Sequence, residues 1–452
     1  MRLPGLTALL MFALPGSAFA QETATQFSGA SVGPVPVEFI LFGLVLLGVA
    51  LFHNKTMQIA IGGAAVIALY KMTASPFRTG AGLWGFGMHL EHEWVILTNL
   101  LMLLVGFSLL ARHFEDSKVP AVLPKFLPDD WSGGLVLLVL IFVLSSFLDN
   151  IAAALIGGAI AHTVYKGKVH IGYLAAIVAA SNAGGSGSVV GDTTTTMMWI
   201  AGVRPFEVFH GYVGALTAMA VFGVPASLLQ QRYAPIQKDA APGIRIDWGR
   251  VSIVAAILVA AVVVNVTINT HFTEISDRFP FLGASVWVVL LVTAGMRKPE
   301  WSLLPGALKG SAFLLSLVLC ASMMPVERLP AASWHAALGL GFISAVFDNI
   351  PLTALALNQG GYDWGMLAYA VGFGGSMIWF GSSAGVAIAT MYPAARSAGQ
   401  WLRHGWFVTV AYVVGFFVLL GVLGFQPGSV PRGSVAPTPA SAVPVPSTTR
   451  MP

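Results

Sequence analysis

The sequence predicts an all-α polytopic membrane protein built from two inverted repeats. Hydrophobic residues make up 56% of its 452 residues and charged residues only 9%, whereas a soluble domain carries about 25% charged residues. The apolar residues gather in runs near the length of a spanning helix. A short motif that places an aspartate inside such a run occurs once in each half of the chain, as expected of a duplicated transporter.

Charge and cysteine content argue against several other classes. The formal net charge of +4 does not indicate nucleic-acid binding, because the basic residues cluster in loops between apolar runs. The single cysteine, Cys320, excludes an internal disulfide framework and argues against a cysteine-rich metal site. No Gly-Lys-Ser/Thr follows the glycine-rich stretch 184–187, which is therefore not a phosphate-binding loop. We expect neither enzymatic activity nor a cofactor.

Residues 1–20 have the features of a secretory signal peptide. Arg2 supplies the positive start, Leu6 to Leu14 form the apolar core, and Ala18-Phe19-Ala20 form a small-x-small cleavage site. The alternative is a short first membrane helix, but two prolines and a glycine leave an apolar core too short to span the bilayer.

Two groups of apolar runs follow, separated by a basic connection at 230–250. The positive-inside rule makes this connection cytoplasmic, and it divides the chain nearly in half, as a linker between repeats would. We therefore expect a first repeat at 35–229, a second at 251–425, and a disordered tail, rich in Pro and Ser, at 426–452. The apolar runs are approximately 35–52, 57–74, 93–111, 134–161, 169–201, 208–229, 250–270, 281–296, 305–325, 334–357, 364–392 and 406–425.

Loop charges predict that the run 134–161 enters the membrane and returns. With the N-terminus outside, three crossings place the basic residues between 112 and 125 inside. A single further crossing would put Lys166 and Lys168 outside, whereas a hairpin keeps them inside. Each arm would have roughly a dozen residues, or about 18 Å of helix, which reaches the middle of the bilayer. The same reasoning makes 334–357 a hairpin that enters from outside. Each half then has five spanning helices and one re-entrant hairpin, and the odd number of crossings inverts the second repeat.

Both predicted hairpin tips carry the motif Ser-x-x-apolar-Asp-Asn-Ile, at Ser145–Ile151 and Ser344–Ile350. An ionised aspartate in hydrocarbon costs several kcal/mol, so Asp149 and Asp348 should face a partner or a water-filled cavity. The default interpretation of each is therefore a functional site. The alternative is that each aspartate only caps the helix that follows it.

Glycine-rich stretches interrupt the run after each hairpin, at Asn182–Thr196 and at Gly374–Gly385. Broken backbone at membrane depth is tolerated only where it lines protein or a wet cavity. Its free carbonyls can bind a cation there, and half-helix N-termini can face an anion. When the two stretches are aligned, Asp192 corresponds to Ser382, Thr193 to Ser383 and Asn182 to Gly372.

The run Asn182-x-Gly-Gly-x-x-Ser-x-x-Gly-Asp-x-Thr-Thr-Thr-Met-Met-Trp-Ile200 resembles the signature of the NhaD-type sodium/proton antiporters. That family belongs to the ion-transporter superfamily, together with the arsenite permeases and the dicarboxylate and citrate carriers. Phe347–Pro351 resembles the family's second-half motif, and the resemblance extends from the first membrane run to Phe425. It implies hairpin tips that meet broken helices, with a dimer interface in the remaining helices.

The sequence departs from the patterns of related families at two places, and both affect which substrate is expected. Where the antiporters have threonines after the first Asp-Asn pair, this chain has Ile151-Ala152-Ala153, which leaves the ion and the number of ion sites open. The dicarboxylate carriers have Ser-Asn-Thr at both tips. Here an aspartate replaces that serine twice, which would repel an anionic substrate.

The chemistry of the candidate residues also favours a cation. Asp149, Asp192 and Asp348 are the acidic residues well inside the apolar runs, and carboxylate, amide, hydroxyl and carbonyl oxygens suit a hard cation. A carboxylate that binds either a proton or a cation would give antiport by competition. The candidate ion- and proton-binding residues are Asp149, Asn150, Asn182, Ser188, Asp192, Thr193, Thr194, Asp348, Asn349, Ser376, Ser382 and Ser383. Gly184, Gly185, Gly374 and Gly375 are candidates for helix breaking or backbone ligation.

We therefore expect a multi-pass transporter of the bacterial inner membrane that exchanges Na⁺ or Li⁺ for H⁺ by alternating access. Its partners would be these ions and membrane lipid, with a homodimer expected from the superfamily and no nucleic acid. One alternative is a cation-coupled carrier of arsenite or of a di- or tricarboxylate. A second alternative is a membrane subunit that transports nothing.

Overall fold

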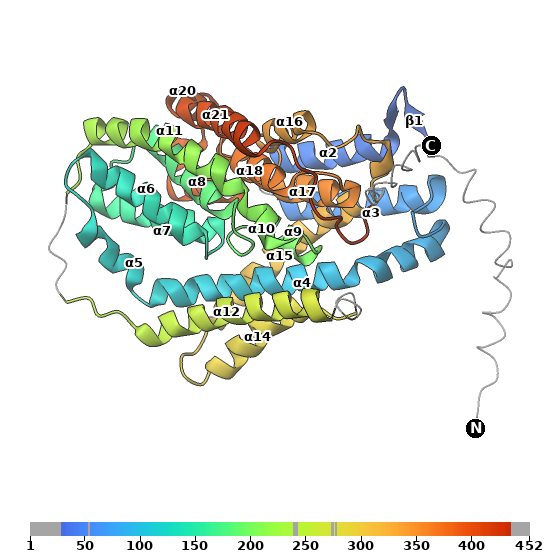
Figure 1. Ribbon diagram of the computed structural model, residues 1–452, viewed down its shortest axis with the longest axis horizontal. Helices are drawn as coiled ribbons and strands as arrows, with labels where there is room; N and C mark the ends of the chain where they lie inside the picture. Colours follow the sequence, from blue (N-terminus) through green and yellow to red (C-terminus); the bar gives the residue numbers. More distant parts are fainter. Residues whose placement is uncertain (1–28, 53–54, 238–242, 273–274, 276–277, 435–452) are drawn as a thin grey trace, which may run out of the picture. The chain divides into compact units, whose positions relative to one another are not determined.

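The computed structural model describes residues 29–434, apart from 53–54, 238–242, 273–274 and 276–277 (Figure 1). The expected signal peptide lies outside the described residues. Within them the chain is mostly helical, and its only named strands are the two-residue β1 (Ser31–Val32) and β2 (Val35–Pro36). The all-α prediction is confirmed for this part of the chain.

Six described helical segments are long and apolar enough to cross a membrane. Shorter apolar helices of 10–17 residues precede the first of them, at Val37–Leu51, and lie between the others in the sequence. The chain is therefore a polytopic membrane protein, as its composition predicts. The six segments are Thr56–Ala74, Gly82–Phe126, Pro205–Tyr233, Trp248–Ile268, Trp301–Ser322 and Trp406–Leu423.

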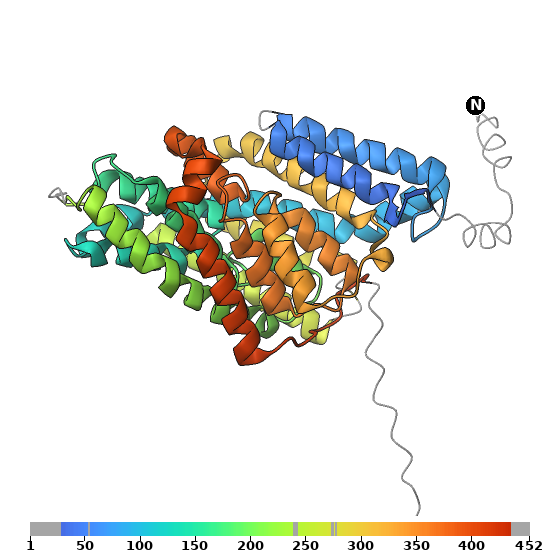
Figure 2. The same ribbon diagram turned by 90° about the horizontal axis from the view of Figure 1, so that it is seen from above.

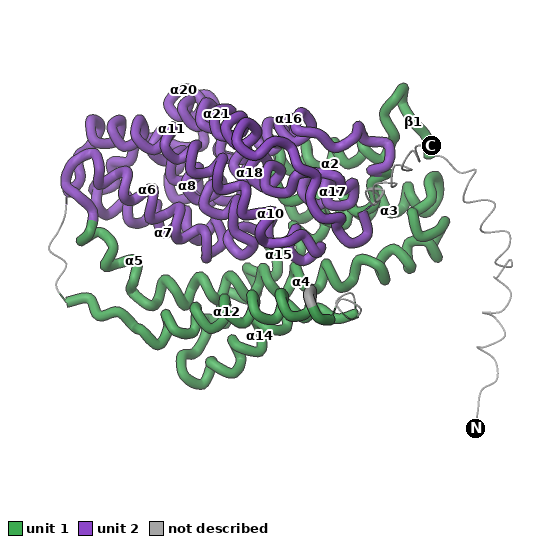
Figure 3. Tube along the Cα trace, viewed as in Figure 1, with its two compact units in different colours: residues 1–126, 240–325, 346–351 green, residues 127–239, 326–345, 352–452 purple. Residues whose placement is uncertain are grey.

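The chain forms two compact units, and each takes segments from both halves of the sequence (Figure 3). The first unit comprises residues 1–126, 240–325 and 346–351. The second comprises residues 127–239, 326–345 and 352–452.

The long helix α4 (Gly82–Asp116) is the centre of the first unit. It packs against α3 (Thr56–Ala74), α12 (Trp248–His271), α14 (Phe281–Thr293) and α15 (Leu304–Ser322). Helix α2 (Val37–Leu51) packs on α3, and the two are drawn in blue beside the gold α15 in Figure 2. Short helices complete this unit: α5 (Val119–Val122), η2 (Leu123–Phe126) and η3 (Trp301–Leu303).

Helices α4 and α14 are joined by polar contacts as well as by packing. The Asn99 side-chain oxygen accepts a hydrogen bond from the Gly283 N–H at 2.9 Å. The Trp287 indole N–H donates to the Met102 carbonyl at 2.9 Å. Asn99 is buried in an apolar helix, so this interhelical bond satisfies a group that would otherwise be costly to bury.

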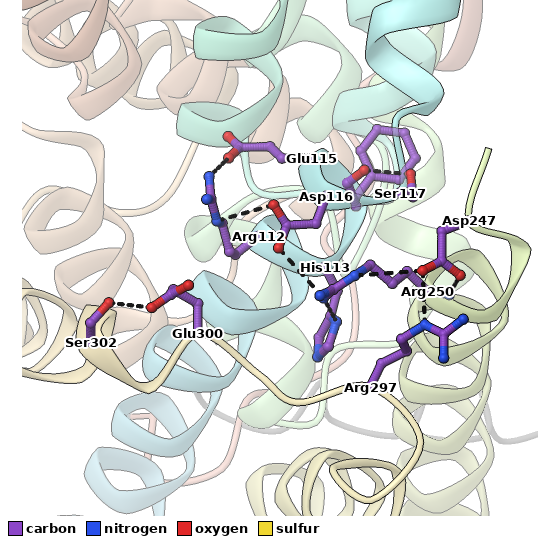
Figure 4. A network of polar contacts seen from close by, with 11 residues as sticks. Arg112, His113, Glu115, Asp116, Ser117, Asp247, Arg250, Arg297, Glu300 and Ser302 are labelled. Atoms are coloured by element: carbon purple, nitrogen blue, oxygen red, sulfur yellow. Dashed lines mark hydrogen bonds and ion pairs between the residues drawn. The ribbon is translucent and has the colours of Figure 1, made fainter. Parts of the chain in front are cut away.

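A network of charged side chains fixes one end of α12 to α4 and to the segment after α14 (Figure 4). Asp116 pairs with Arg250 at 3.5 Å. Asp247, just before α12, accepts a hydrogen bond from Arg297 Nε at 2.8 Å. The Arg297 guanidinium holds the pKa of the Asp247 carboxyl below its ordinary value. These residues lie at helix ends, where charges can remain hydrated.

The second unit contains the same order of elements twice. In the first half, α6 (Trp131–Ser145) and α7 (Asn150–Val164) precede α8 (Ile171–Gly185), a break and α9 (Thr193–Ile200). In the second half, α16 (Trp334–Ser344) and α17 (Asn349–Gln359) precede α18 (Trp364–Gly374), a break and α19 (Ser383–Met391). The other elements are α10 (Pro205–Phe209), α11 (Gly211–Tyr233), η4 (Val326–Arg328), η5 (Pro393–Arg396), α20 (Ala398–His404) and α21 (Trp406–Leu423).

The two halves meet inside the second unit. Helix α7 packs against α19, α8 packs against α18, and α11 runs against α21. All described residues of α18 and nearly all of α8 are buried. A helix that is apolar all round belongs in the core of a large bundle, and these two helices hold the breaks at the centre of the unit.

The first residues of the expected disordered tail are bound to the second unit. The Gln426 N–H donates to Asp363 Oδ2 at 3.0 Å, and the Gly428 N–H donates to the Tyr362 carbonyl at 3.0 Å. The Arg432 N–H donates to the Ala201 carbonyl at 2.9 Å. The expectation of disorder therefore does not hold for residues 426–434, whose backbone groups find partners, and residues 435–452 lie outside the described part.

Candidate functional site

Asp149 and Asp348 occupy equivalent positions at the starts of α7 and α17. The Asp149 carboxylate accepts a hydrogen bond from the Ile151 N–H at 2.7 Å. The Asp348 carboxylate accepts one from the Ile350 N–H at 3.0 Å. Each aspartate therefore satisfies an unpaired amide of the first helical turn. The capping role weighed at the sequence level is present at both positions, and it does not exclude a second role for either carboxylate.

The glycines of the breaks allow backbones to approach closely. A Cβ on Gly184 would lie 2.0 Å from the Phe142 carbonyl oxygen of α6, and one on Gly185 would lie 2.8 Å from Asp192 Cβ. In the second half, a Cβ on Gly374 would lie 2.3 Å from the Gly341 carbonyl oxygen of α16. Gly375 is similarly confined, by the Gly381 carbonyl oxygen at 2.7 Å. All four predicted glycines thus sit where no side chain fits without a shift.

A buried polar cluster joins the first tip to the first break. The Asn150 side-chain amide donates to Asn182 Oδ1 at 3.1 Å and to Asp192 Oδ1 at 3.1 Å. The Thr194 hydroxyl donates to Asp192 Oδ2. All four side chains are buried. The carboxylate of Asp192 is therefore held on both oxygens by neutral donors from α7 and α9.

The same cluster reaches the second break through Asn182. Its amide nitrogen donates to Ser376 Oγ at 2.9 Å and to Ser382 Oγ at 3.1 Å. Both serines are buried and lie within the break between α18 and α19. Six of the predicted residues thus form one hydrogen-bonded group, although the outer pair is about two hundred positions from Asn182. We call this group the Asp192 cluster, comprising Asn150, Asn182, Asp192, Thr194, Ser376 and Ser382.

Asp192 differs from the other aspartates at the starts of described helices, such as Asp130, Asp149 and Asp363, whose side chains cap the helix. It occupies the N-cap position of α9, but its side chain makes no capping hydrogen bond. Ser382 occupies the equivalent position of α19 and does cap that helix, accepting from the Gly385 N–H at 3.3 Å. The Asp192 carboxylate is turned into the cluster instead, so capping does not account for an aspartate at this position.

The remaining predicted residues lie outside these hydrogen bonds. The Ser188 hydroxyl donates to the Ser146 carbonyl at 2.7 Å. Thr193 and Ser383 are the half-buried first residues of α9 and α19. Asp348 and Asn349 group with the first compact unit and are described only within it. In the described residues no group of three or more His, Cys, Asp or Glu side chains could hold a metal ion. Asp348 lies in the other compact unit, so a grouping of Asp149, Asp192 and Asp348 at one site stays a prediction. Amide and hydroxyl groups contact the Asp192 carboxylate.

Two features near the cluster escaped sequence reasoning. The Tyr212 hydroxyl of α11 donates to the Gly184 carbonyl at 3.2 Å, and a Cβ on Gly187 would lie 2.4 Å from the Tyr212 ring. Gly372 of α18 faces Asp192. Nothing in the local sequence marks Tyr212, whereas the alignment of the two breaks pairs Gly372 with Asn182.

Gly381-Ser382-Ser383-Ala384-Gly385 also matches the Gly-x-Ser-x-Gly pattern of the α/β-hydrolases. That pattern acts at a sharp turn between a strand and a helix. Here it runs from the break after α18 into the first turn of α19, with no strand before it, so it supplies no nucleophile elbow.

Comparison with known proteins gives several relatives, while no family model matches the chain. "Sodium/proton antiporter 1" of Arabidopsis thaliana is 24% identical over 328 residues, which is 63% of this chain and 53% of that protein. "Na(+)/H(+) antiporter NhaD" of Vibrio parahaemolyticus is 26% identical over 354 residues, 66% of this chain and 84% of that one. The protein of the same name from Halomonas elongata is 26% identical over 329 residues, 62% and 66%.

The chain thus spans about half the length of the first plant relative and most of the length of the Vibrio protein. The relatives' names confirm the resemblance to the NhaD-type family that the motifs predict. They are names of transporters, in agreement with the expectation that the chain is not an enzyme.

Proposed function

We propose that this chain, a relative of the NhaD-type sodium/proton antiporters, exchanges Na⁺ or Li⁺ for H⁺ across a bacterial inner membrane. The observation that carries the proposal is the Asp192 carboxylate. It is buried, does not cap its helix, and is hydrogen-bonded to Asn150 and Thr194. A buried carboxylate at an uncapped helix start is expensive unless a proton or a cation neutralises it.

The oxygen atoms of the cluster suit a hard cation. Carboxylate, amide and hydroxyl oxygens are the ligands that such ions prefer. A proton and a cation would compete for the Asp192 carboxylate. The transporter would therefore carry either a proton or a cation at this site, and never both at once. Asp149, Asp348 and Asn349 would complete the ion pathway from the two tips. Ser188, Thr193 and Ser383 would line the breaks, and the glycines would shape them.

The proposed architecture is that of two inverted repeats, 35–229 and 251–425, joined by a cytoplasmic linker at 230–250. The pairs α6–α7 and α16–α17 would be the re-entrant hairpins. The recurrence of helix pair, helix, break and helix in both halves supports this assignment. Both breaks belong to the second unit, whereas α2–α4 and α12–α15 belong to the first. This division supports a transport unit formed by the second unit and a scaffold formed by the first. Alternating access and a homodimer formed through the scaffold follow the superfamily expectation.

The test is ΔpH dequenching in everted vesicles from a host that lacks its own antiporters, with Na⁺, Li⁺ and K⁺ added in turn. The wild-type chain should collapse the pH gradient on addition of Na⁺ or Li⁺, and Asp192→Asn should abolish this response. Asp130→Asn is the matched control, because Asp130 caps α6 through the Ser132 N–H at 2.9 Å and asparagine caps equally well.

Cation-dependent flux that persists in Asp192→Asn, at normal protein levels, would overturn the assignment of the site. No response of the wild-type chain to any cation would favour a carrier of arsenite or dicarboxylates, which uptake assays with those anions would identify. If none of these substrates is transported, the remaining hypothesis is a membrane subunit that transports nothing.

A further inference from the structure

We infer that Gly372 determines which cation size the Asp192 cluster accepts. This inference rests on the proposed cation exchange and adds a specificity-determining position to it. Gly372 lies in the buried helix α18, three residues before the second break and outside the hydrogen bonds of the cluster.

The backbone of Gly372 faces the Asp192 carboxylate. A Cβ built on this residue would lie 3.4 Å from Asp192 Oδ2 and 3.5 Å from Ser186 Cβ, and these are its two nearest neighbours. In the first half the equivalent position is Asn182, whose side chain is the centre of the hydrogen-bonded group. The two repeats therefore place an amide on one side of the site and a bare backbone on the other.

Packing does not explain this glycine. The distances of 3.4 and 3.5 Å are ordinary van der Waals contacts, so an alanine methyl would fit. Gly374, two residues later, is different, because its Cβ would lie 2.3 Å from a carbonyl oxygen of α16. Glycine inside a helix is about 1 kcal/mol less favourable than alanine. Close packing of protein atoms therefore does not explain why position 372 lacks a side chain. The atom nearest to a methyl group at this position would be a carboxylate oxygen of Asp192.

The consequence for a bound cation depends on its size. Asp192 Oδ2 accepts from Thr194 on one side and faces Gly372 on another. A methyl group at 372 would crowd an ion that approaches Oδ2 from the α18 side. Na⁺ is larger than Li⁺ and needs more ligands or retained water, so it should be affected more. A proton needs no such space, so proton binding should persist.

The test compares Gly372→Ala with wild type in the ΔpH assay, titrating LiCl and NaCl at ionic strength held constant with choline chloride. We expect the half-saturating Na⁺ concentration to rise about tenfold, as one misplaced methyl group can achieve in a fitted site. The half-saturating Li⁺ concentration should change by less than about twofold, since a smaller ion avoids the methyl contact. Gly339→Ala is the matched control, because Gly339 lies in α16 of the same unit with no atom within 4 Å of its Cβ position.

Folding is checked separately by the thermal midpoint of the purified variant without Li⁺ or Na⁺, and cation binding by the rise in that midpoint on adding each ion. A variant with normal folding and unchanged Na⁺ and Li⁺ titrations would overturn the inference. Equal weakening of both ions would also overturn it, because that outcome indicates a displaced carboxylate. If the wild-type chain shows no cation-dependent flux, the proposed function fails first, which is a distinguishable result.

Discussion

At the scale of single residues, aspartates that each precede a helix make different hydrogen bonds. Asp130 and Asp149 both accept a hydrogen bond from the first turn of the helix they precede. Asp192 gives up that bond, which is typically worth about 1 kcal/mol. Its carboxylate has neutral donors in the cluster instead. An aspartate that does not make the stabilising capping hydrogen bond is a stronger functional candidate than one that makes it.

Asp149→Asn separates capping from charge. Asparagine caps a helix about as well as aspartate, so the thermal midpoint of the variant should match that of wild type. The carboxylate is lost, however, and we expect Na⁺-dependent dequenching to fall several-fold. Asp149→Ala should lower both stability and flux, with a loss of stability of about 1 kcal/mol. Na⁺-dependent flux equal to that of wild type in Asp149→Asn would show that Asp149 acts only as a helix cap.

Asn182→Ala tests the centre of the cluster. The change leaves Asn150, Ser376 and Ser382 without the hydrogen bonds that Asn182 makes to them in a buried site. Each buried polar group left unsatisfied costs about 1–3 kcal/mol, so the thermal midpoint should fall clearly and flux should be lost. Thr217→Ala is a control, since its hydroxyl bonds only within α11. A midpoint equal to that of wild type would contradict the role of Asn182 as the centre of the hydrogen-bonded group.

Sequence reasoning found the members of this cluster but not how they are connected. The aspartate and the glycine-rich breaks are visible because a polar residue in an apolar run is costly. Which amide meets which hydroxyl depends on side-chain placement to within an ångström, and no local pattern encodes it. Gly372 was noticed only as a departure from repeat symmetry. Its position next to Asp192 requires the tertiary packing of α18.

At the scale of elements, the segment 426–434 shows the limit of composition as a guide. It is rich in Pro, Gly and Ser, which predicts disorder. Its ordered state depends on partners far away in the sequence. Glu207 of α10 accepts from the Ser429 N–H at 2.9 Å and from its hydroxyl at 2.8 Å, and the Trp364 indole donates to the Ser429 carbonyl at 2.8 Å.

Glu207→Ala should release this segment. Hydrogen bonds to a charged group contribute about 1.5–3 kcal/mol, and the two bonds to Glu207 would be lost together. Limited proteolysis should then cut within residues 426–434 faster than in wild type. Ser429→Ala removes only the hydroxyl bond and should have a smaller effect. Equal cleavage rates in wild type and Glu207→Ala would show that the backbone bonds to the α17–α18 connection hold the segment without Glu207.

At the scale of the whole molecule, the compact units do not follow the two halves of the sequence. Hydropathy and loop charge predicted repeats in succession, at 35–229 and 251–425. Each compact unit takes elements from both of these halves. Hydropathy reports which segments are apolar, while partner choice depends on complementary faces such as Gly106 of α4 against Val286 of α14. Helical content and membrane character were therefore predictable from composition, and the grouping of hairpins with broken helices from both halves was implied by the family resemblance, whereas the contacting faces were not predictable.

The proposed re-entrant hairpin makes a prediction about the whole chain, since it fixes on which side each loop lies. If α6 and α7 enter and return on one side, Lys125 and Lys168 lie on the same, cytoplasmic side. If residues 134–161 cross once, the two lie on opposite sides. The only native cysteine, Cys320, is buried and can be replaced by alanine. Single cysteines are then placed at the exposed positions Lys125, Lys168 and Glu327.

A membrane-impermeant maleimide applied to intact cells should label Glu327→Cys, in the connection before α16, and neither lysine variant. In everted vesicles the pattern should reverse. This follows because a charged reagent cannot cross the bilayer core, so labelling reports the side alone. Labelling of Lys168→Cys from the outside, with Lys125→Cys protected, would replace the hairpin by a single crossing. The inverted relation of the two repeats would then be lost, because the count of crossings in the first half would no longer be odd.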